Sequence, residues 1–212
     1  MRHNPDYRLD DESSIRELVR ENPWATIVSH VPGAGLVASH YPVLLDEDAE
    51  GIVLLSHVGR PDERLHELGR HDLMVIVYGP SGYVSPGWYD VSHAVPTWDF
   101  VVAHLHGTPE ILADDENLRV LDRLVERFER VLPDPYLMNR TLENADYAAR
   151  IVHGTVGFRM VVTRFEAKEK MSQDKPADVV ARVIEALRQP GPYRNPALAS
   201  RIERTRVEAV AP

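Results

Sequence analysis

The chain of 212 residues has no cysteine, no apolar run long enough to cross a bilayer and no excess of positive charge. The absence of cysteine excludes disulfide bonds, thiolate metal sites and cysteine nucleophiles. A membrane span needs about 20 consecutive apolar residues, so we expect no membrane protein. The first six residues are polar and lack the apolar core of a signal peptide. These absences together predict a cytoplasmic protein.

Acidic side chains outnumber basic ones by 33 to 24, which gives a formal net charge of −9 with histidine neutral. Binding to nucleic acid depends on neutralising phosphates with Lys and Arg. The sequence shows no helix-turn-helix pattern and no basic recognition helix. Its one basic cluster is a short C-terminal group, made of Arg194, Arg201, Arg204 and Arg206. We therefore expect direct, specific DNA binding to be weak or absent.

Several signatures of side-chain catalysis are also missing. The sequence has no nucleophile elbow, no phosphate-binding lysine loop and no dinucleotide glycine fingerprint. Its carboxylates are spread over the faces of predicted helices, where they solvate the surface. No catalytic residue is identified, and any reaction would belong to a bound cofactor.

The apolar pattern predicts six strands and six helices. The strands are expected over residues 24–29, 36–45, 52–57, 73–78, 100–112 and 157–167. The helices are expected from Asp10 to before Pro23, over 60–68, 114–132, 144–152 and 176–188, and as a marginal helix over 197–206. The first is expected to bury Ile15, Leu18 and Val19, and the longest to place Leu118, Leu121, Val125 and Phe128 on one face.

This order of elements indicates the fold class. The early strands are joined by tight turns and the helices are inserted late, which favours an α+β, mainly β chain: a six-stranded antiparallel barrel with peripheral helices. The run Gln189-Pro190-Gly191-Pro192 breaks regular structure. We therefore expect one domain over residues 1–190 and a weakly ordered C-terminal extension over residues 191–212.

An aromatic turn beside a strand with two histidines is the most informative local feature. The turn spans residues 82–89, and residues 95–107 follow it. Aromatic side chains in a rigid loop beside a polar strand face suit a planar, hydrogen-bonding ligand. A buried aromatic plug at a barrel corner is the alternative, and Trp88 and Trp98 fit either interpretation.

The strand over 100–112 alternates between two faces. The apolar face, expected to meet the core, holds Val101, Ala103, Leu105, Gly107 and Ile111. The other face holds Phe100, Val102, His104, His106 and Thr108. That face would meet a helix, a partner subunit or a cofactor. A metal on its two histidines would need a third ligand, which no local motif supplies.

Two further segments place polar groups where a ligand could use them. Ser56 and Arg60 flank the turn from a strand into a helix, where a hydroxyl, a guanidinium and helix amides suit a phosphate. The alternative is that Ser56 caps the helix and Arg60 is solvated. His40, beside Ser39 in an otherwise apolar strand, needs a hydrogen-bond partner and is either structural or a ligand.

The same segments resemble the PaiB family of FMN-binding split-barrel proteins. The resemblance rests on Trp88-Tyr89, on Val95-Pro96-Thr97-Trp98 and on the strand that ends in His104-Leu105-His106-Gly107. The stretches 38–45, 56–60, 156–158 and 170–174 resemble the family's early strand, His-x-x-Arg turn, late strand and Lys-x-Ser-Gln signature. Two positions depart from the family: Asp99 stands where Asn is usual, and Gly59-Arg60-Pro61-Asp62 replaces Ala-Asn-Pro around the turn arginine.

The resemblance implies a split barrel that forms a homodimer with FMN at the subunit interface. It implies a transcriptional regulator or a small flavin-dependent reductase. The residues expected to bind the cofactor are Ser39, His40, Ser56, His57, Arg60, Trp98, His104, Lys170, Ser172 and Gln173.

Two alternatives stay open beside FMN. The related piperazate synthases use haem on this scaffold to join two nitrogens. A haem b enzyme of that kind would take an axial ligand from His40, His57 or His104. The other alternative is a regulatory or interaction protein without a cofactor.

Overall fold

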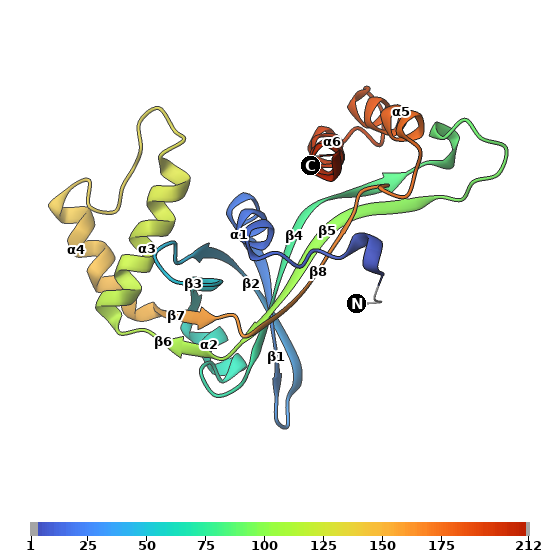
Figure 1. Cartoon of the computed structure of the whole chain (residues 1–212). Helices are drawn as coiled ribbons and strands as arrows, with labels where there is room; N and C mark the ends of the chain where they lie inside the picture. Colours follow the sequence, from blue (N-terminus) through green and yellow to red (C-terminus); the bar gives the residue numbers. More distant parts are fainter. Residues whose placement is uncertain (1–3, 211–212) are drawn as a thin grey trace. The chain divides into compact units, whose positions relative to one another are not determined.

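The structure, a computed structural model, describes residues 4–210, with side chains up to Arg206. Residues 1–3, at the start of the predicted domain, and residues 211–212, at the end of the predicted C-terminal extension, lie outside the described residues. The chain forms two compact units (Figure 1). The terminal unit comprises Met1–Asp11, Tyr78–Ala103 and Glu166–Pro212, and the central unit comprises Glu12–Val77 and His104–Phe165.

The central unit combines five complete strands with four α-helices and a short 3-10 helix. Its elements are α1 (Glu12–Glu21), β1 (Trp24–Val31), β2 (Gly35–Leu45), β3 (Val53–Gly59), α2 (Arg60–His66), β6 (Pro109–Ile111), α3 (Asp114–Glu129), α4 (Leu142–Ile151), η3 (Val152–Gly154) and β7 (Thr155–Val161). The first part of β4 (Leu73–Val84) also belongs to it. As predicted, α1 buries Ile15, Leu18 and Val19.

The terminal unit contains both ends of the described chain. Its elements are η1 (Pro5–Tyr7), the later part of β4, η2 (Pro86–Trp88), most of β5 (Thr97–Gly107), most of β8 (Arg164–Lys170), α5 (Ala177–Arg188) and α6 (Pro196–Val210). Residues 191–212 were expected to be weakly ordered, but α6 packs on α5 and fully buries Leu198, Ala199 and Ile202. Arg201 is also buried, so the predicted basic cluster does not lie wholly on the surface.

The chain is α+β, with one eight-stranded antiparallel sheet in the order β6-β7-β3-β2-β1-β4-β5-β8. The prediction of six strands was wrong, because two predicted strands each divide. The run 100–112 becomes β5 and β6, and the run 157–167 becomes β7 and β8. Each division falls where the chain changes neighbours: β5 lies between β4 and β8, whereas β6 pairs with β7.

Gly107 marks the first of these changes. A Cβ atom at this position would stand 2.2 Å from the carbonyl oxygen of Val161, so the close approach of the two backbones needs a glycine. The alternation of β5 agrees with the prediction for Val101, Ala103 and Leu105, which are buried. Ile111 was placed wrongly on this buried face: it lies in β6 and is exposed.

The residues that α3 buries are not those of the apolar row seen in the sequence. The helix buries Asn117, Val120 and Leu124, not the predicted row of Leu118, Leu121, Val125 and Phe128. Val120 and Leu124 pack with Leu44 of β2 and Leu55 of β3. Asn117 shares the buried face, where its side chain donates to Thr155 Oγ1 at 3.0 Å, whereas Leu121, Val125 and Phe128 of the predicted row line one cavity together.

Among residues 4–210, no helix combines the length and the apolar character that a membrane span requires.

Candidate functional site

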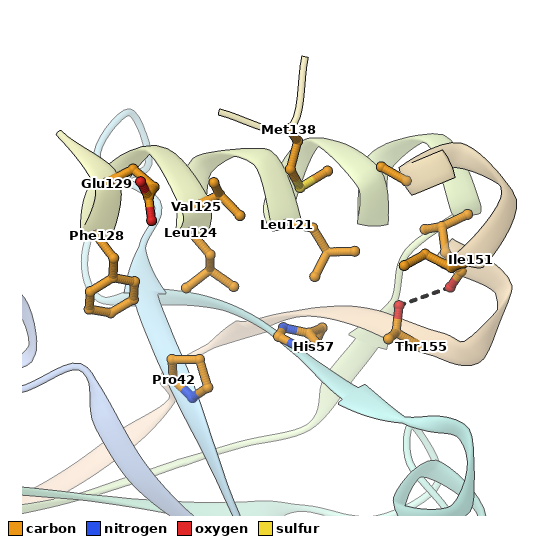
Figure 2. Close-up of a pocket in the computed structure, with 12 residues that line it drawn as sticks. Pro42, His57, Leu121, Leu124, Val125, Phe128, Glu129, Met138, Ile151 and Thr155 are labelled. Carbon is orange, nitrogen blue, oxygen red and sulfur yellow. Dashed lines mark hydrogen bonds between the residues drawn. The ribbon is translucent and has the colours of Figure 1, made fainter. Parts of the chain in front are cut away.

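A cavity of about 410 Å³ opens in the central unit between α3, α4 and the strands (Figure 2). Its lining is almost wholly apolar and consists of Pro42, His57, Leu121, Leu124, Val125, Phe128, Glu129, Met138, Ala148, Ile151, Val152 and Thr155. Figure 2 shows Leu121, Leu124 and Phe128 of α3 on one side, with His57 and Pro42 on the other. The volume falls in the range of roughly 300–1,000 Å³ that is typical of small-molecule sites.

His57 is one of three polar residues in this mostly apolar lining, with Glu129 and Thr155, and it comes from β3. Its Nδ1 atom is buried and has no hydrogen-bond partner. Burial lowers the pKa of the His57 imidazole, which therefore stays neutral near pH 7. Its ring meets the Tyr41 ring edge-on, with centroids 5.8 Å apart. A buried polar atom without a partner costs stability, and an unpaired nitrogen on a residue that lines a cavity calls for an explanation such as a ligand.

Ser56 does not share this cavity, although it precedes His57 in the sequence. Side chains alternate between the two faces of a strand, so the two residues point to opposite sides of β3. The Ser56 hydroxyl is buried and donates to the carbonyl of Pro42 at 2.7 Å. The nearby Gly59 amide donates to the Tyr41 hydroxyl at 3.0 Å, and that hydroxyl donates to Asp62. Two donors of the predicted phosphate turn are therefore engaged within the chain.

Arg60, the third group of that turn, lies beside η3. Its Nε donates to the carbonyl of His153 at 3.0 Å, and its Nη2 lies 3.9 Å from Asp114 Oδ1. Asp114 also contacts the His153 ring at 2.8 Å. Val152 and Thr155, on either side of His153, both line the cavity. The structure thus brings Arg60 and His57 to the same region, and Arg60 remains partly exposed.

Ser39 and His40 separate in the same way as Ser56 and His57. The Ser39 hydroxyl lies 3.0 Å from Nε2 of the buried His66, whose Nδ1 lies 2.7 Å from Ser29 Oγ. His40 lies on the exposed side of β2, with Nδ1 3.0 Å from Thr26 Oγ1. Among the three haem-ligand candidates, His57 is the one that lines the cavity; His104 is half-buried in β5.

The other predicted site residues gather in the terminal unit around Asp99. This carboxylate is fully buried and accepts from Ser172 Oγ at 2.6 Å and from Lys170 Nζ at 3.2 Å. Burial raises the pKa of Asp99, against the opposing effect of Ser172 and Lys170. Lys170 Nζ also donates to the carbonyl of Trp98 at 3.0 Å and to the Thr97 hydroxyl.

The remaining polar groups of this cluster close their own turn. The Gln173 side chain accepts from the Met171 amide at 2.6 Å and donates to the Glu169 carbonyl at 2.6 Å. Ser172 holds a left-handed backbone with φ of 56°. Trp98, in contrast, is 58 % exposed. Lys170, Ser172 and Gln173 are thus satisfied by the chain itself, and Asp99 is the partner that holds the first two.

Sequence reasoning missed most of the cavity. Leu121, Val125 and Phe128 were predicted only to share one face of a helix, and Met138 and Ile151 were not singled out. The sequence carried one signal, an apolar row on α3 wider than a single packed face needs. Within the part of the chain that the structure describes, no three His, Asp or Glu side chains gather as a metal site would require.

Comparison with known proteins shows the family to which the chain is similar. Residues 1–164 match the family described as "Putative FMN-binding domain". The chain is 27% identical to Protease synthase and sporulation protein PAI 2 of Bacillus subtilis over 183 residues, which cover 85% of this chain and 86% of that protein. It is 32% identical to the uncharacterized protein YKL070W of Saccharomyces cerevisiae over 111 residues, 49% of this chain and 66% of that protein.

Solved structures agree on the fold. The FAD and heme binding protein from Mycobacterium smegmatis matches with a TM-score of 0.56 at 20% identity, covering 82% of this chain and 78% of that one. The flavocytochrome Anf3 from Azotobacter vinelandii matches with a TM-score of 0.55 at 13% identity, covering 77% of this chain and 69% of that one. The resemblance to the PaiB family is confirmed, and the chain belongs to the family of FMN-binding domains that residues 1–164 match.

Proposed function

We propose that this chain binds FMN and that the cavity beside His57 receives its ring system. The observation that carries the proposal is the apolar cavity of about 410 Å³ that His57 lines, together with the buried Nδ1 atom of that residue, which has no hydrogen-bond partner. An isoalloxazine ring is flat and largely apolar, with polar atoms along one edge. The cavity lining suits its faces, and the imidazole nitrogen would meet a polar edge atom.

Arg60 is the group that would hold the FMN phosphate. The Ser56 hydroxyl and the Gly59 amide already have partners within the chain, so the grip rests on the guanidinium. Arg60 lies near Asp114 at 3.9 Å, a separation that leaves its remaining N–H groups available to a stronger anion. The exposed side of Arg60 would face the phosphate, and the apolar cavity would exclude water from the rings.

The bound flavin would supply electron transfer, and the chain would bind and orient it. This supports a small flavin-dependent reductase or a regulator that responds to the flavin. The net charge of −9 disfavours a regulator that reads DNA through its own side chains. A footprint on one promoter that persists at physiological salt would contradict this part of the proposal.

The test of the phosphate contact is Arg60→Ala. A charge-assisted hydrogen bond contributes roughly 1.5–3 kcal/mol, so the variant should bind FMN about tenfold to a hundredfold more weakly. Riboflavin, which lacks the phosphate, should bind the variant and the wild type equally. Arg64→Ala, at an exposed position of the same helix, is the matched control and should leave both affinities unchanged. Equal FMN affinity in Arg60→Ala and wild type would contradict the proposed phosphate contact.

Haem is the second candidate, and the position of His57 favours it. An imidazole that is neutral because it is buried keeps a nitrogen lone pair for iron. The visible spectrum of the purified protein separates the cofactors, since flavin gives two bands and haem one sharp Soret band. If haem is present, His57→Ala should abolish or shift the Soret band, whereas His40→Ala and His104→Ala should preserve it. Loss of the band in either control variant instead would reassign the ligand.

The homodimer also remains a proposal, supported by the PaiB resemblance. Trp24 and Trp98 are 63% and 58% exposed, which is unusual for tryptophan and typical of residues that a partner covers. Light scattering at micromolar concentration should give twice the monomer mass. A monomer mass throughout that range would count against the dimer.

A further inference from the structure

A second hollow lies on the opposite face of α3 from the cavity that holds His57. Its volume is about 290 Å³, and it is lined by Leu44, Leu45, Glu47, Arg123, Glu126, Arg127 and Arg130. An α-helix turns by about 100° per residue, which sets Arg123 and Arg127 nearly opposite to Leu121 and Val125. The two sites therefore share a helix but not a face. We call this site the arginine hollow.

Arginines outnumber carboxylates in the lining of the arginine hollow, where Arg123, Arg127 and Arg130 lie with Glu47 and Glu126. Arg16 and Arg20 share one carboxylate, Glu47, with contacts of 2.7 Å each. Hydrogen bonds from these arginines hold the pKa of Glu47 at about 2. Arg130 pairs with Glu126 at 2.8 Å. Both carboxylates that line the hollow, Glu47 and Glu126, are thus engaged by arginines other than Arg123 and Arg127.

Arg123 and Arg127 remain without a carboxylate partner among the described residues. Arg123 donates to the carbonyl of Leu45 at 3.1 Å, and Arg127 donates to the carbonyl of Arg20. Each guanidinium has five N–H donors, and these contacts engage one nitrogen of each. Like charges one helical turn apart repel each other. The backbone contacts therefore hold two cations together at a position that an anion would stabilise.

We propose that the arginine hollow binds a small organic anion, with its carboxylate or phosphate group between Arg123 and Arg127. Guanidinium forks match the planar oxygens of these groups and hold them more strongly than neutral donors do. Leu44 and Leu45 offer an apolar surface for the rest of the ligand. The limited volume suits a small molecule, and two unpaired arginines are too few for tight binding of a polynucleotide. The site is separate from the proposed FMN site.

The experiment uses calorimetric titration of the full chain with phenyl phosphate, inorganic phosphate and succinate at constant ionic strength. Binding of phenyl phosphate should be saturable and tighter than that of inorganic phosphate, because its ring meets the leucines. Tighter binding of succinate would identify a carboxylate ligand, which the proposal also covers. The double variant Arg123→Gln/Arg127→Gln should bind the preferred anion about tenfold to a hundredfold more weakly.

Arg119→Gln is the matched control, because Arg119 lies on the same helix and pairs with Asp115 at 3.1 Å. It should bind the anion as the wild type does, and thermal melting should show both variants folded. Equal anion binding by the double variant, no saturable binding at millimolar concentration, or an equal loss in the control would overturn the proposal. So would tighter, arginine-dependent binding of duplex DNA. The double variant should bind FMN with unchanged affinity. A loss of FMN affinity would show that the two sites are not separate and would overturn that part of the proposal. Arg60→Ala tests the flavin site independently.

Discussion

The two places where the predicted site residues gather differ in how far the chain satisfies its own polar groups. In the central unit, His57 meets apolar side chains and leaves Nδ1 without a partner. In the terminal unit, Asp99 accepts from both Ser172 and Lys170, and Lys170 has two further acceptors. A buried group that lacks a partner costs stability and can gain from a ligand, whereas a satisfied network gains little.

From this difference we infer a binding role for one region and a structural role for the other. The cavity has volume, and His57, which lines it, has a buried nitrogen without a partner, so our proposal puts the cofactor there. The cluster around Asp99 links β5 to the turn after β8, and the neighbouring Glu169 forms a buried ion pair with Arg201 of α6. We therefore interpret the Lys-x-Ser-Gln signature as a structural contact within the terminal unit.

The largest expected effect comes from breaking the satisfied cluster. Asp99→Ala leaves Ser172 without its acceptor and Lys170 without its counter-ion, at a site that is fully buried on the Asp99 side. Removing one partner of a buried ion pair costs about 3–5 kcal/mol, and the low end applies because Lys170 keeps the Trp98 carbonyl and Thr97. Urea denaturation should show the loss as a lower midpoint.

Asp99→Asn is the matched variant, since it restores the residue usual in the family and keeps an acceptor for Ser172. Burial raises the pKa of Asp99, so the charge itself is held at a cost. We expect Asn to cost about 1 kcal/mol or less. If Asn destabilises the chain as much as Ala does, the ion pair rather than the Ser172 bond holds the cluster.

The next effect has the opposite sign and tests the unsatisfied region. His57→Phe places an apolar ring of similar shape in an apolar cavity and removes the unpartnered Nδ1. Replacing a buried, unpaired polar group by an apolar one is neutral to stabilising, and we expect a gain of about 1 kcal/mol in the free energy of unfolding. Cofactor binding should weaken in the same variant. His40→Phe, at an exposed position, should give no gain; a matching gain there would make the effect one of general hydrophobicity.

The sequence predicted the elements well because their local signals were strong. The apolar period of residues 15–19 identified α1, and the alternation of Val101, Ala103 and Leu105 identified the buried face of β5. The sequence could not predict that two strands divide. The chain passes from one neighbouring strand to another near Gly107 and after Val161, and the apolar pattern does not change at either point. Partner choice depends on residues distant in the sequence.

The site was predicted less well, for two physical reasons. Proximity in sequence suggested that Ser56 and His57 act together, but a strand with period two separates them. A motif match also says nothing about whether its side chains are already paired, and Lys170, Ser172 and Gln173 prove to be. Of the predicted site residues, His57 is the one that lines the cavity.

The smallest expected effect is on the pH dependence of stability, and it separates the two regions by sign. Burial holds the pKa of His57 in the folded chain below the 6.5 of an exposed histidine. As the pH falls through about 6.5, the unfolded chain takes up a proton that the folded chain resists. Stability is therefore full above this pH and declines as the pH falls towards the folded-state pKa. Asp99 behaves oppositely, because a raised pKa makes the folded chain the better proton acceptor just above pH 3.8.

Urea midpoints of wild type and His57→Phe between about pH 7 and pH 5 should diverge, with the wild type losing more. His66, whose pKa burial also lowers, is present in both proteins and cancels in the difference. Parallel midpoints would show that His57 is not the group whose burial sets this slope.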